Sequence, residues 1–142
     1  MILGIGSDIV DIDRIQRTIE RFGERFIKRV FTDAERDRAE GKPTWAEIYA
    51  KRFAAKEAVW KALGEGPRLG ISWRELAVSN TESGKPRLTL HGAAGELLLA
   101  LTPVGMTPRV DLSLSDEPPL AQAFVVISAD PAHQVATRPV DQ

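Results

Sequence analysis

The pattern of apolar and polar positions predicts that the first half of the chain is mostly helical. Residues 2–10 are the exception, because their apolar and β-branched side chains, with two glycines, predict a buried strand. From residue 12 to residue 30, apolar side chains recur every three or four positions, which predicts a helix that only Gly23 could interrupt. The apolar positions of this helix are Ile12, Ile15, Ile19, Phe22, Phe26 and Val30.

Two capping-box sequences mark the starts of the next helices. Residues 32–35 (TDAE) predict a short polar helix to about Glu40, since the threonine and the glutamate can satisfy each other's backbone donors. Residues 44–47 (TWAE) predict in the same way the start of the longest helix, which ends near Leu63. Gly64 is the expected C-terminal cap of that helix.

The second half of the chain is richer in strands. Strands are expected over residues 75–80 and 87–90, followed by a short apolar helix over 92–101. Apolar and polar side chains alternate over 110–115, which predicts a half-buried strand, and the last strand is expected over 121–127. Because helices come mostly first and strands mostly later, the sequence predicts an α+β fold, with an antiparallel sheet packed against the long central helix.

Length and composition limit the possible organisation. The 142 residues, of which 43% are hydrophobic and 27% charged, are enough for one globular domain, which we expect over residues 1–129. The remaining residues, 130–142, include two prolines and few apolar side chains, so they predict a flexible tail.

Composition also narrows the chemistry. A net charge of -1 argues against bulk binding of nucleic acid. The chain has no cysteine, and His91 and His133 are far apart, so a bound metal would be held mainly by oxygen and would be magnesium, manganese or calcium. No basic segment precedes an apolar one at the start, and no long apolar run occurs, so we expect a cytoplasmic protein with no membrane partner.

Asp8 and Glu57 form the first candidate site. Asp8 follows two glycines in the first strand, and Glu57 lies in the longest helix. Two carboxylates from different elements match how magnesium is held in phosphate enzymes, together with phosphate oxygens and water. A plainer interpretation is also open, in which Asp8 caps a turn and Glu57 pairs with Lys61 or Arg52 on the surface.

Lys61 precedes a glycine-rich bend that contains Gly64 and Gly66. An ammonium beside such a bend suits a pyrophosphate, because small residues let backbone N–H groups approach the anion. Helix capping alone also explains these glycines. Gly4 and Gly6 match only the start of a dinucleotide-binding fingerprint, since no third glycine follows at the required spacing.

A row of basic side chains is predicted on the helix that starts at residue 12. At 3.6 residues per turn these side chains share one narrow sector, with the apolar stripe on the opposite side. Such a row can dock an acidic partner, although a solvated helix face is the plainer alternative. The five residues are Arg14, Arg17, Arg21, Arg25 and Lys28.

Taken in order, these motifs resemble those of the holo-acyl-carrier-protein synthases, the small 4'-phosphopantetheinyl transferases. The similarity runs from about residue 2 to residue 128, and its most specific part is the run RFAAKEA at 52–58. The other matching segments are Gly4–Ile9 with Arg14-Ile15, Phe31-Thr32 with Glu35, Lys61-Ala62, Gly64 with Gly66, Gly84–Pro86, Ser113–Asp116 and Ala121–Ile127.

The resemblance implies an activity. The 4'-phosphopantetheine group of coenzyme A would be transferred to a serine of apo acyl carrier protein in fatty acid biosynthesis, with release of adenosine 3',5'-bisphosphate. It also implies a magnesium ion held by Asp8 and Glu57, a catalytic Lys61 that neutralises the pyrophosphate, and a homotrimer with active sites between protomers. Arg14 would meet the carrier protein, and the basic row extends this expected docking surface to Arg21 and Arg25.

The resemblance further implies the residues that bind coenzyme A. These are Arg52, Lys61, Gly64, Gly66, Pro86 and Ser113. Many family members have a histidine where this chain has Asp111, and a carboxylate there would repel a phosphate. We therefore expect Arg52 of a neighbouring protomer to anchor the 3'-phosphate.

Two points stay open from the sequence. Glu57 is the first candidate to take the proton of the carrier serine, and Asp116 is the second. A non-catalytic module that binds carrier proteins is the alternative function, and it would be favoured if Asp8, Glu57 or Lys61 were missing. A nucleotide-binding protein that uses Gly4 and Gly6 as a phosphate loop is a third possibility.

Overall fold

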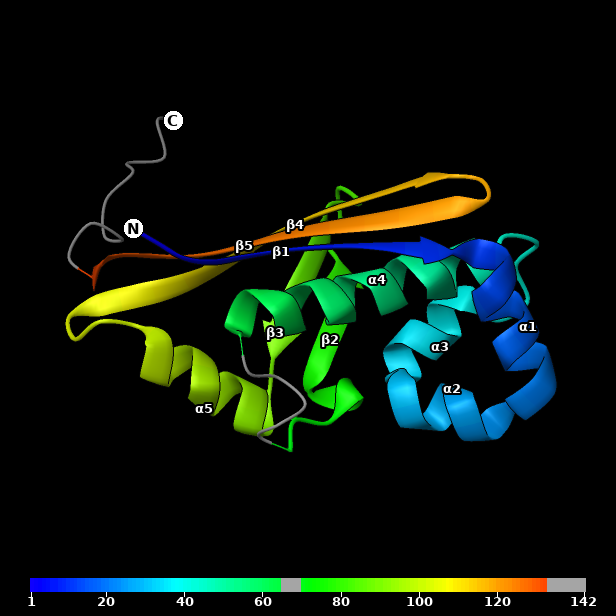
Figure 1. The fold of residues 1–142 in the computed structure, drawn as a ribbon, viewed down its shortest axis with the longest axis horizontal. Coiled ribbons are helices and arrows are strands. Elements are labelled where there is room, and N and C mark those ends of the chain that lie inside the picture. Colours follow the sequence, from blue (N-terminus) through cyan, green and yellow to red (C-terminus); the bar gives the residue numbers. More distant parts are fainter. Residues whose placement is uncertain (65–69, 133–142) are drawn as a thin grey trace.

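The computed structural model describes residues 1–64 and 70–132 (Figure 1). Within these residues the chain forms an α+β fold, as the sequence predicts. The elements are β1 (Ile2–Asp11), α1 (Ile12–Phe22), α2 (Glu24–Val30), α3 (Asp33–Ala39), α4 (Trp45–Leu63), the 3-10 turn η2 (Trp73–Glu75), β2 (Leu76–Asn80), β3 (Pro86–Leu90), α5 (Gly92–Leu101), β4 (Met106–Glu117) and β5 (Leu120–Pro131).

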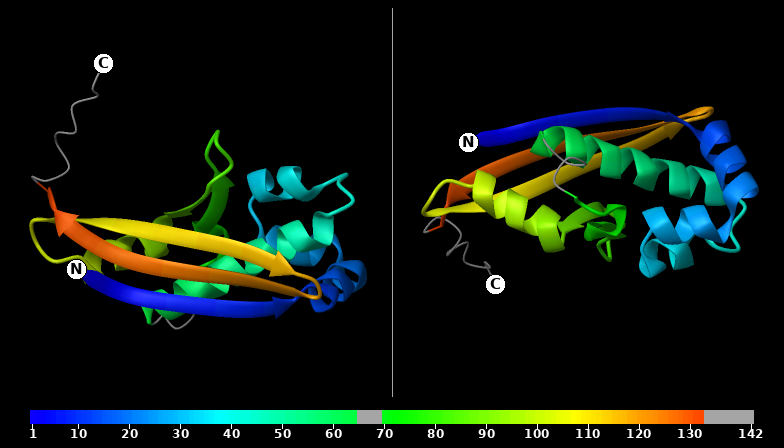
Figure 2. Two further views of the ribbon diagram at one scale, coloured as in Figure 1. Left: turned by 90° about the horizontal axis from the view of Figure 1, so that it is seen from above. Right: turned by 60° about the horizontal axis from the view of Figure 1, so that its bottom comes forward.

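The described strands form two antiparallel sheets. The larger sheet has the order β1-β5-β4, and β2 pairs with β3 in a separate hairpin. All helices lie on one side of the larger sheet, with α4 directly against it, and the other face is left uncovered by the described chain (Figures 1 and 2). That uncovered face carries large apolar side chains, including the exposed Ile5, Ile9 and Phe124.

Helix α4 can lie directly on β1 because β1 has no side chains at the points of contact. A Cβ atom on Gly4 would overlap the carbonyl oxygen of Ala62, and one on Gly6 would overlap that of Ala58. Both glycines lie within a paired strand rather than in a loop. The possibility that they form a phosphate loop is therefore wrong, since these glycines serve packing of a helix on a strand.

The helix predicted from residue 12 to residue 30 is divided at Gly23. This glycine has φ 55° and ψ -132°, which ends α1 and starts α2 in a new direction (Figure 1). The prediction that the basic side chains form one row along a single helix is therefore wrong, because Arg21 lies on α1 whereas Arg25 lies on α2. Phe22 is also exposed rather than part of the apolar stripe.

The two predicted capping boxes have different outcomes. At Thr32 the box is complete, because the hydroxyl accepts from Glu35 N at 3.2 Å and Glu35 Oε1 accepts from Thr32 N at 2.8 Å. At Thr44 no side-chain cap forms, so that prediction is wrong even though α4 begins at Trp45. Gly64 caps α4 in the left-handed conformation with φ 82°, as predicted.

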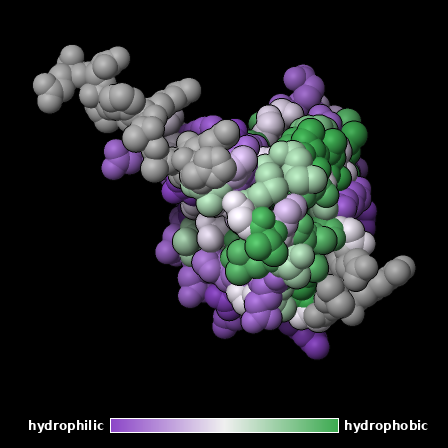
Figure 3. Space-filling view, turned by 90° about the vertical axis from the view of Figure 1, so that its left-hand side faces the viewer, coloured by the Kyte–Doolittle hydropathy of each residue, from purple (hydrophilic) through white to green (hydrophobic). Residues whose placement is uncertain are grey.

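The ends of the molecule differ in character. Strand β5 includes Asp130 and Pro131, so the sheet extends into the tail predicted over 130–142, and the part of that tail from residue 133 lies outside the described residues. At the α5 end, an apolar area is visible on the surface (Figure 3). Leu99, Leu101 and Val104 are exposed there.

Within the described part of the chain, no helix is both long and apolar enough to cross a membrane.

Candidate active site

Asp8 lies on the inward face of β1, next to helix α4. Gly4, Gly6 and Asp8 occupy every second position of β1, so all three lie on the face that meets the helices. Because the other two are glycines, Asp8 is the one whose side chain projects toward the helices. The residue is only 8% exposed. Asp8 is thus a nearly buried carboxylate in a strand, and the alternative in which it caps a turn is wrong.

Lys61 supplies a positive charge to this carboxylate. Its Nζ lies 3.0 Å from Asp8 Oδ1, and it donates a hydrogen bond to the carbonyl oxygen of Ser7 at 2.9 Å. Lys61 therefore pairs across to β1, rather than with Glu57 one turn earlier on its own helix. The structure thus brings together Asp8 and Lys61, which are distant in sequence and were predicted from the sequence to share one site.

Glu57 is the second carboxylate of the pair. Its pKa is raised to about 7, first because partial burial disfavours the charged form and next because Asp8 lies close to it. Lys61 and Arg14 act in the opposite direction, since their positive charges lower the pKa. A carboxyl group with this pKa exchanges protons near neutral pH, which suits a general acid or base.

One oxygen of Asp8 lacks a partner. Oδ2 is buried and has no hydrogen-bond partner among the described residues. A buried carboxylate oxygen without a donor is costly unless a cation or a proton is supplied. With Glu57 protonated, the proton can bridge the two carboxyl groups, and with Glu57 ionised, the pair can hold a cation.

The donor set fits magnesium. This ion prefers oxygen ligands and usually takes one or two carboxylates, with water and phosphate oxygens completing the shell. Asp8 Oδ2 and the Glu57 carboxylate meet that need. Across residues 1–64 and 70–132 no group of three or more histidine, aspartate or glutamate side chains is placed to hold a metal, so an all-protein cage is not offered there.

A cavity of about 140 Å³ opens beside Glu57. Arg14 of α1 lies in its wall with Glu57, and the remaining wall is mostly apolar, including Ile15, Phe26 and Phe53. Phe53 lies one turn before Glu57 on α4, so both share one helix face. The aromatic lining was missed from the sequence, although this spacing of Phe53 and Glu57 in α4 could have indicated it.

A buried ion pair between Lys56 and Glu35 fixes this part of α4 to the core. Lys56 Nζ lies 2.7 Å from Glu35 Oε1 and donates to the carbonyl oxygens of Val30 at 2.8 Å and Trp73 at 3.1 Å. Glu35 Oε2 accepts from Val78 N at 2.7 Å. Both charged side chains are fully buried, and burial lowers the pKa of Lys56 while Glu35 counteracts this. The pair joins α4 to α3, η2 and β2.

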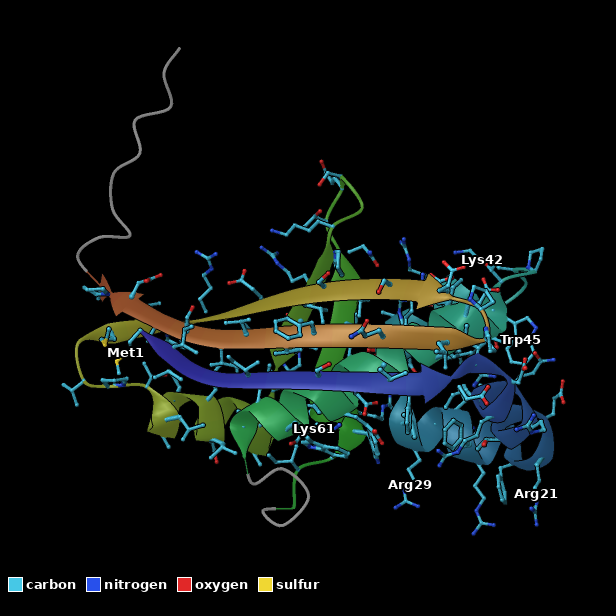
Figure 4. All side chains as sticks on the ribbon, turned by 45° about the horizontal axis from the view of Figure 1, so that its top comes forward. Met1, Arg21, Arg29, Lys42, Trp45 and Lys61 are labelled. Carbon is cyan, nitrogen blue, oxygen red and sulfur yellow. The ribbon has the colours of Figure 1, made fainter. Side chains whose placement is uncertain are left out.

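A second, basic pocket of about 250 Å³ lies on another side of α4. Arg52 is five residues before Glu57, which at 3.6 residues per turn places the two about 140° apart around the helix. Figure 4 shows Lys42 near the β4 edge of the sheet and Lys61 near the β1 edge. The pocket is lined by Arg38, Lys42, Ile48, Lys51, Arg52, Asn80, Gly84, Pro86 and Leu114.

Arg52 has a hydrogen-bond donor without a partner in this pocket. It is 4% exposed and donates from Nη2 to Asn80 Oδ1 at 3.0 Å, whereas its Nε is buried and has no partner among the described residues. Arg52 thus pairs with neither Glu57 nor another carboxylate, so the plainer interpretation, in which Glu57 pairs with Lys61 or Arg52 on the surface, is wrong for Arg52. The sequence indicated Arg52 and Pro86 but missed Arg38 and Lys42, which come from a different helix and the following turn.

The remaining predicted residues of the described chain are not in the lining of either pocket. Ser113 is exposed on the uncovered face of the sheet. Its neighbour Leu114 faces the opposite way and lines the basic pocket. Asp111 is paired with Arg109 at 2.7 Å, and Asp116 with Lys51 at 2.9 Å. The predicted Gly66 lies outside the described residues.

Comparison with known proteins identifies the family. The family model of the 4'-phosphopantetheinyl transferase superfamily matches residues 4–113. The chain belongs to this superfamily. Among its relatives, the holo-[acyl-carrier-protein] synthase of Rhodopseudomonas palustris (strain ATCC BAA-98 / CGA009) is 60% identical over 136 residues, which cover 93% of each chain.

Solved structures agree with this assignment. A crystal structure of holo-[acyl-carrier-protein] synthase from Neisseria meningitidis matches with a TM-score of 0.79 at 39% identity, covering 90% of this chain and 99% of that one. The Helicobacter pylori synthase in complex with coenzyme A matches with a TM-score of 0.73 at 30% identity, covering 87% and 99%. The predicted fold and family are therefore confirmed, and the chain is a phosphopantetheinyl transferase of the holo-[acyl-carrier-protein] synthase type.

Proposed function

We propose that this transferase moves the 4'-phosphopantetheine group of coenzyme A to a serine hydroxyl of apo acyl carrier protein in fatty acid biosynthesis. The observation that carries this proposal is the convergence of Asp8, Glu57 and Lys61 from two different elements. A module that only binds carrier proteins would have no need for a nearly buried Asp8 beside a partly buried Glu57 whose pKa is raised. The same convergence therefore favours catalysis over the alternative of a binding module.

The reaction needs charge stabilisation and proton removal more than covalent help. The serine oxygen forms a bond to the phosphorus that carries the pantetheine group, and the bond from that phosphorus to the bridging pyrophosphate oxygen breaks. Adenosine 3',5'-bisphosphate leaves with the bridging oxygen. Lys61 offsets the negative charge on the phosphates, and the serine proton leaves through a water molecule that Glu57, the first candidate for the base, orients. Asp116 is less suited, because Lys51 already pairs with it.

A magnesium ion held by Asp8 and Glu57 would supply further neutralisation of the pyrophosphate when bound. The chain's contribution is to hold both carboxylates close together. The unpartnered Asp8 Oδ2 is the atom that supports this assignment.

We place the two ends of coenzyme A in two different protomers of a homotrimer. Lys61, which pairs with Asp8, lies near the β1 edge of the sheet, whereas the basic pocket is lined by Leu114 of β4 and by Lys42, which lies near the β4 edge (Figure 4). One protomer's basic pocket would then bind the 3'-phosphate of a coenzyme A whose pyrophosphate reaches Lys61 of the neighbour. The uncovered sheet face, with Ile5 and Phe124 exposed, is an apolar surface available for this assembly.

The acyl carrier protein would dock over α1. Arg14 lies in the wall of the cavity beside Glu57, so it is the arginine nearest to the proposed chemistry. Arg21 is exposed at the end of α1, and Arg25 extends the basic surface onto α2. The apolar walls of the cavity suit an aliphatic side chain next to the reactive serine.

The intact mass of apo acyl carrier protein after incubation with the enzyme, coenzyme A and magnesium tests the proposal. We expect a gain of one phosphopantetheine, which is lost with a chelator and in Asp8→Asn or Glu57→Gln. Glu96→Gln is a matched control, because Glu96 is an exposed carboxylate on the distant α5. Carrier protein that binds to the folded enzyme without any mass gain would instead support the binding module.

A further inference from the structure

Lys61 reaches from the surface to a nearly buried partner. Its side chain is 56% exposed, whereas the side chain of Asp8 is 9% exposed. The ammonium touches two oxygens of β1, Asp8 Oδ1 at 3.0 Å and the Ser7 carbonyl at 2.9 Å. Figure 4 shows Lys61 on α4 beside β1. The ammonium therefore occupies a position where oxygens converge on a cation.

We propose that Lys61 holds the cation position at Asp8 until a divalent cation binds, and that it then leaves Asp8 to pair with the pyrophosphate of coenzyme A. This inference rests on the proposed function, because it assigns the same lysine two successive partners. It makes Lys61 an exchangeable counter-charge of Asp8 rather than a fixed part of the phosphate site.

The charges around Asp8 support an exchange. Without a metal, a nearly buried carboxylate needs a counter-charge, and Lys61 is the cation within ion-pair distance among the described residues. A divalent cation brings two positive charges to Asp8 and Glu57, after which the ammonium is no longer needed there. Three hydrogen-bond donors on a flexible four-carbon stem allow a lysine to change partners easily.

Because the side chain of Lys61 is exposed, little free energy is needed to move its ammonium away from Asp8. A half-exposed ion pair contributes little net stability, since water can replace either partner. The opposite arrangement is seen five residues earlier, where Lys56 is fully buried among Glu35 and two carbonyl oxygens. Of these two lysines, only Lys61 is free to exchange without opening the core.

A static role for Lys61 is the competing explanation. In that case, the ammonium would stay on Asp8 Oδ1 and merely orient the carboxylate, while the metal used the free Oδ2. The two explanations differ in one observable: whether the ammonium environment of Lys61 changes when the metal binds in the absence of coenzyme A.

Nuclear magnetic resonance of lysine ammonium groups measures this directly. In ¹⁵N-labelled enzyme titrated with magnesium alone, we expect the Lys61 Nζ signal to move to the position of an exposed lysine such as Lys42. The Lys56 signal is the internal control and should stay in place, because its partners are unaffected. Calorimetry on the same sample establishes when the metal site is saturated.

Affinity measurements on variants give a second, independent test. Lys61→Met should bind magnesium about two- to fivefold more tightly without coenzyme A, since a competing half-exposed ion pair is removed. Arg14→Met is the matched control, because Arg14 also places positive charge near Glu57 but makes no ion pair with Asp8. We expect its effect to be clearly smaller.

The outcomes separate this inference from the proposed function. A Lys61 signal that stays fixed in metal-saturated enzyme would overturn the exchange and leave the proposed function standing. Equal tightening in Lys61→Met and Arg14→Met would overturn it too, because general repulsion would then be the cause. No magnesium binding at all, or binding that survives Asp8→Asn, would overturn both the exchange and the metal site.

Discussion

The carbonyl oxygen of Ala58 occupies the space in which a Cβ atom on Gly6 would have to lie. Backbone thus meets backbone where α4 crosses β1, and Gly4 repeats the contact with Ala62. Glu57 and Lys61 each precede one of these alanines in α4. The close contact is therefore what brings Glu57 and Lys61, two residues of the candidate site, against the strand that carries Asp8.

Gly6→Ala should disrupt the fold and the site together. The added methyl group cannot be accommodated by a side-chain rotation, because the opposing atom belongs to the backbone of α4. We expect a loss of at least about 1–3 kcal/mol in the free energy of unfolding, as for other overpacked cores. Denaturant unfolding measures this, with Ser7→Ala on the opposite face of β1 as control. A Gly6→Ala protein of normal stability that fails only to bind coenzyme A would restore the phosphate-loop interpretation.

Protonation of Glu57 should control metal binding. Its pKa of about 7 means that protons compete with the metal in the neutral range. The apparent magnesium affinity should therefore fall by up to about tenfold per pH unit below pH 7 and level off above it. Calorimetry across this range measures the effect. A flat profile between pH 5 and pH 7 would show that Glu57 ionises at its ordinary value, near 4.5.

The same group should influence stability without metal. The folded-state pKa of Glu57, about 7, exceeds the ordinary value of 4.5, so the native protein binds this proton more tightly than the unfolded chain. The resulting stabilisation is present below pH 4.5 and is lost as pH rises through 7. Melting temperatures in chelator should show this decline in the native protein and less of it in Glu57→Gln. Asp8→Asn should lower the pKa of Glu57 only partly, because burial, the largest cause, remains.

Most of the fold could be predicted because local pattern and tertiary packing agree. The complete capping box at Thr32 and the left-handed cap at Gly64 are local features, and both occur as expected. The capping box at Thr44 failed although its sequence is equally suitable, and α4 starts there without that help. Gly23 was recognised as a possible interruption, but the new direction of α2 depends on packing that the sequence pattern does not contain.

That Asp8, Glu57 and Lys61 belong together could be predicted from the sequence, but how they are arranged could not. Asp8, Glu57 and Lys61 could be chosen from their chemistry and motifs, whereas the pairing of Lys61 with Asp8 rather than Glu57 depends on how α4 lies against β1. The two glycines illustrate this difference. A pattern of Gly4 and Gly6 fits a phosphate loop as well as a helix contact, and only the neighbouring backbone decides between them.

The buried pair of Lys56 and Glu35 should be far more important for stability than the surface pairs. Lys56→Met leaves Glu35 as an uncompensated buried charge, so we expect a loss of about 3–5 kcal/mol in the free energy of unfolding. The double variant Lys56→Met/Glu35→Gln should be less destabilised than the sum of the two single variants. Breaking the exposed Lys28–Glu24 pair with Lys28→Ala should cost about 1 kcal/mol or less. Additive losses in the buried cycle would argue against a coupled pair.

The arginines of α1 should affect the carrier protein and not coenzyme A. Arg14→Ala and Arg21→Ala should each raise the KM for acyl carrier protein by about two- to fivefold and weaken its salt dependence, as expected for exposed ion pairs. Arg74→Ala is the matched control, because Arg74 is already paired with Asp33 on another part of the surface. Initial rates over a range of salt concentrations provide the comparison. A rise in the KM for coenzyme A instead would move these arginines to the nucleotide side of the site.

Active sites shared between protomers should allow inactive variants to rescue each other. Glu57→Gln removes the carboxylate pair, and Arg38→Ala/Lys42→Ala weakens the basic pocket at exposed positions. If the two proteins are mixed equally, unfolded and reassembled as trimers, about one quarter of the sites should combine an intact carboxylate pair with an intact neighbouring pocket. Transfer rates of the mixture should then exceed those of either parent treated alone. Rates equal to the mean of the parents, in a preparation that sediments as a mixed trimer, would place the whole site within one protomer.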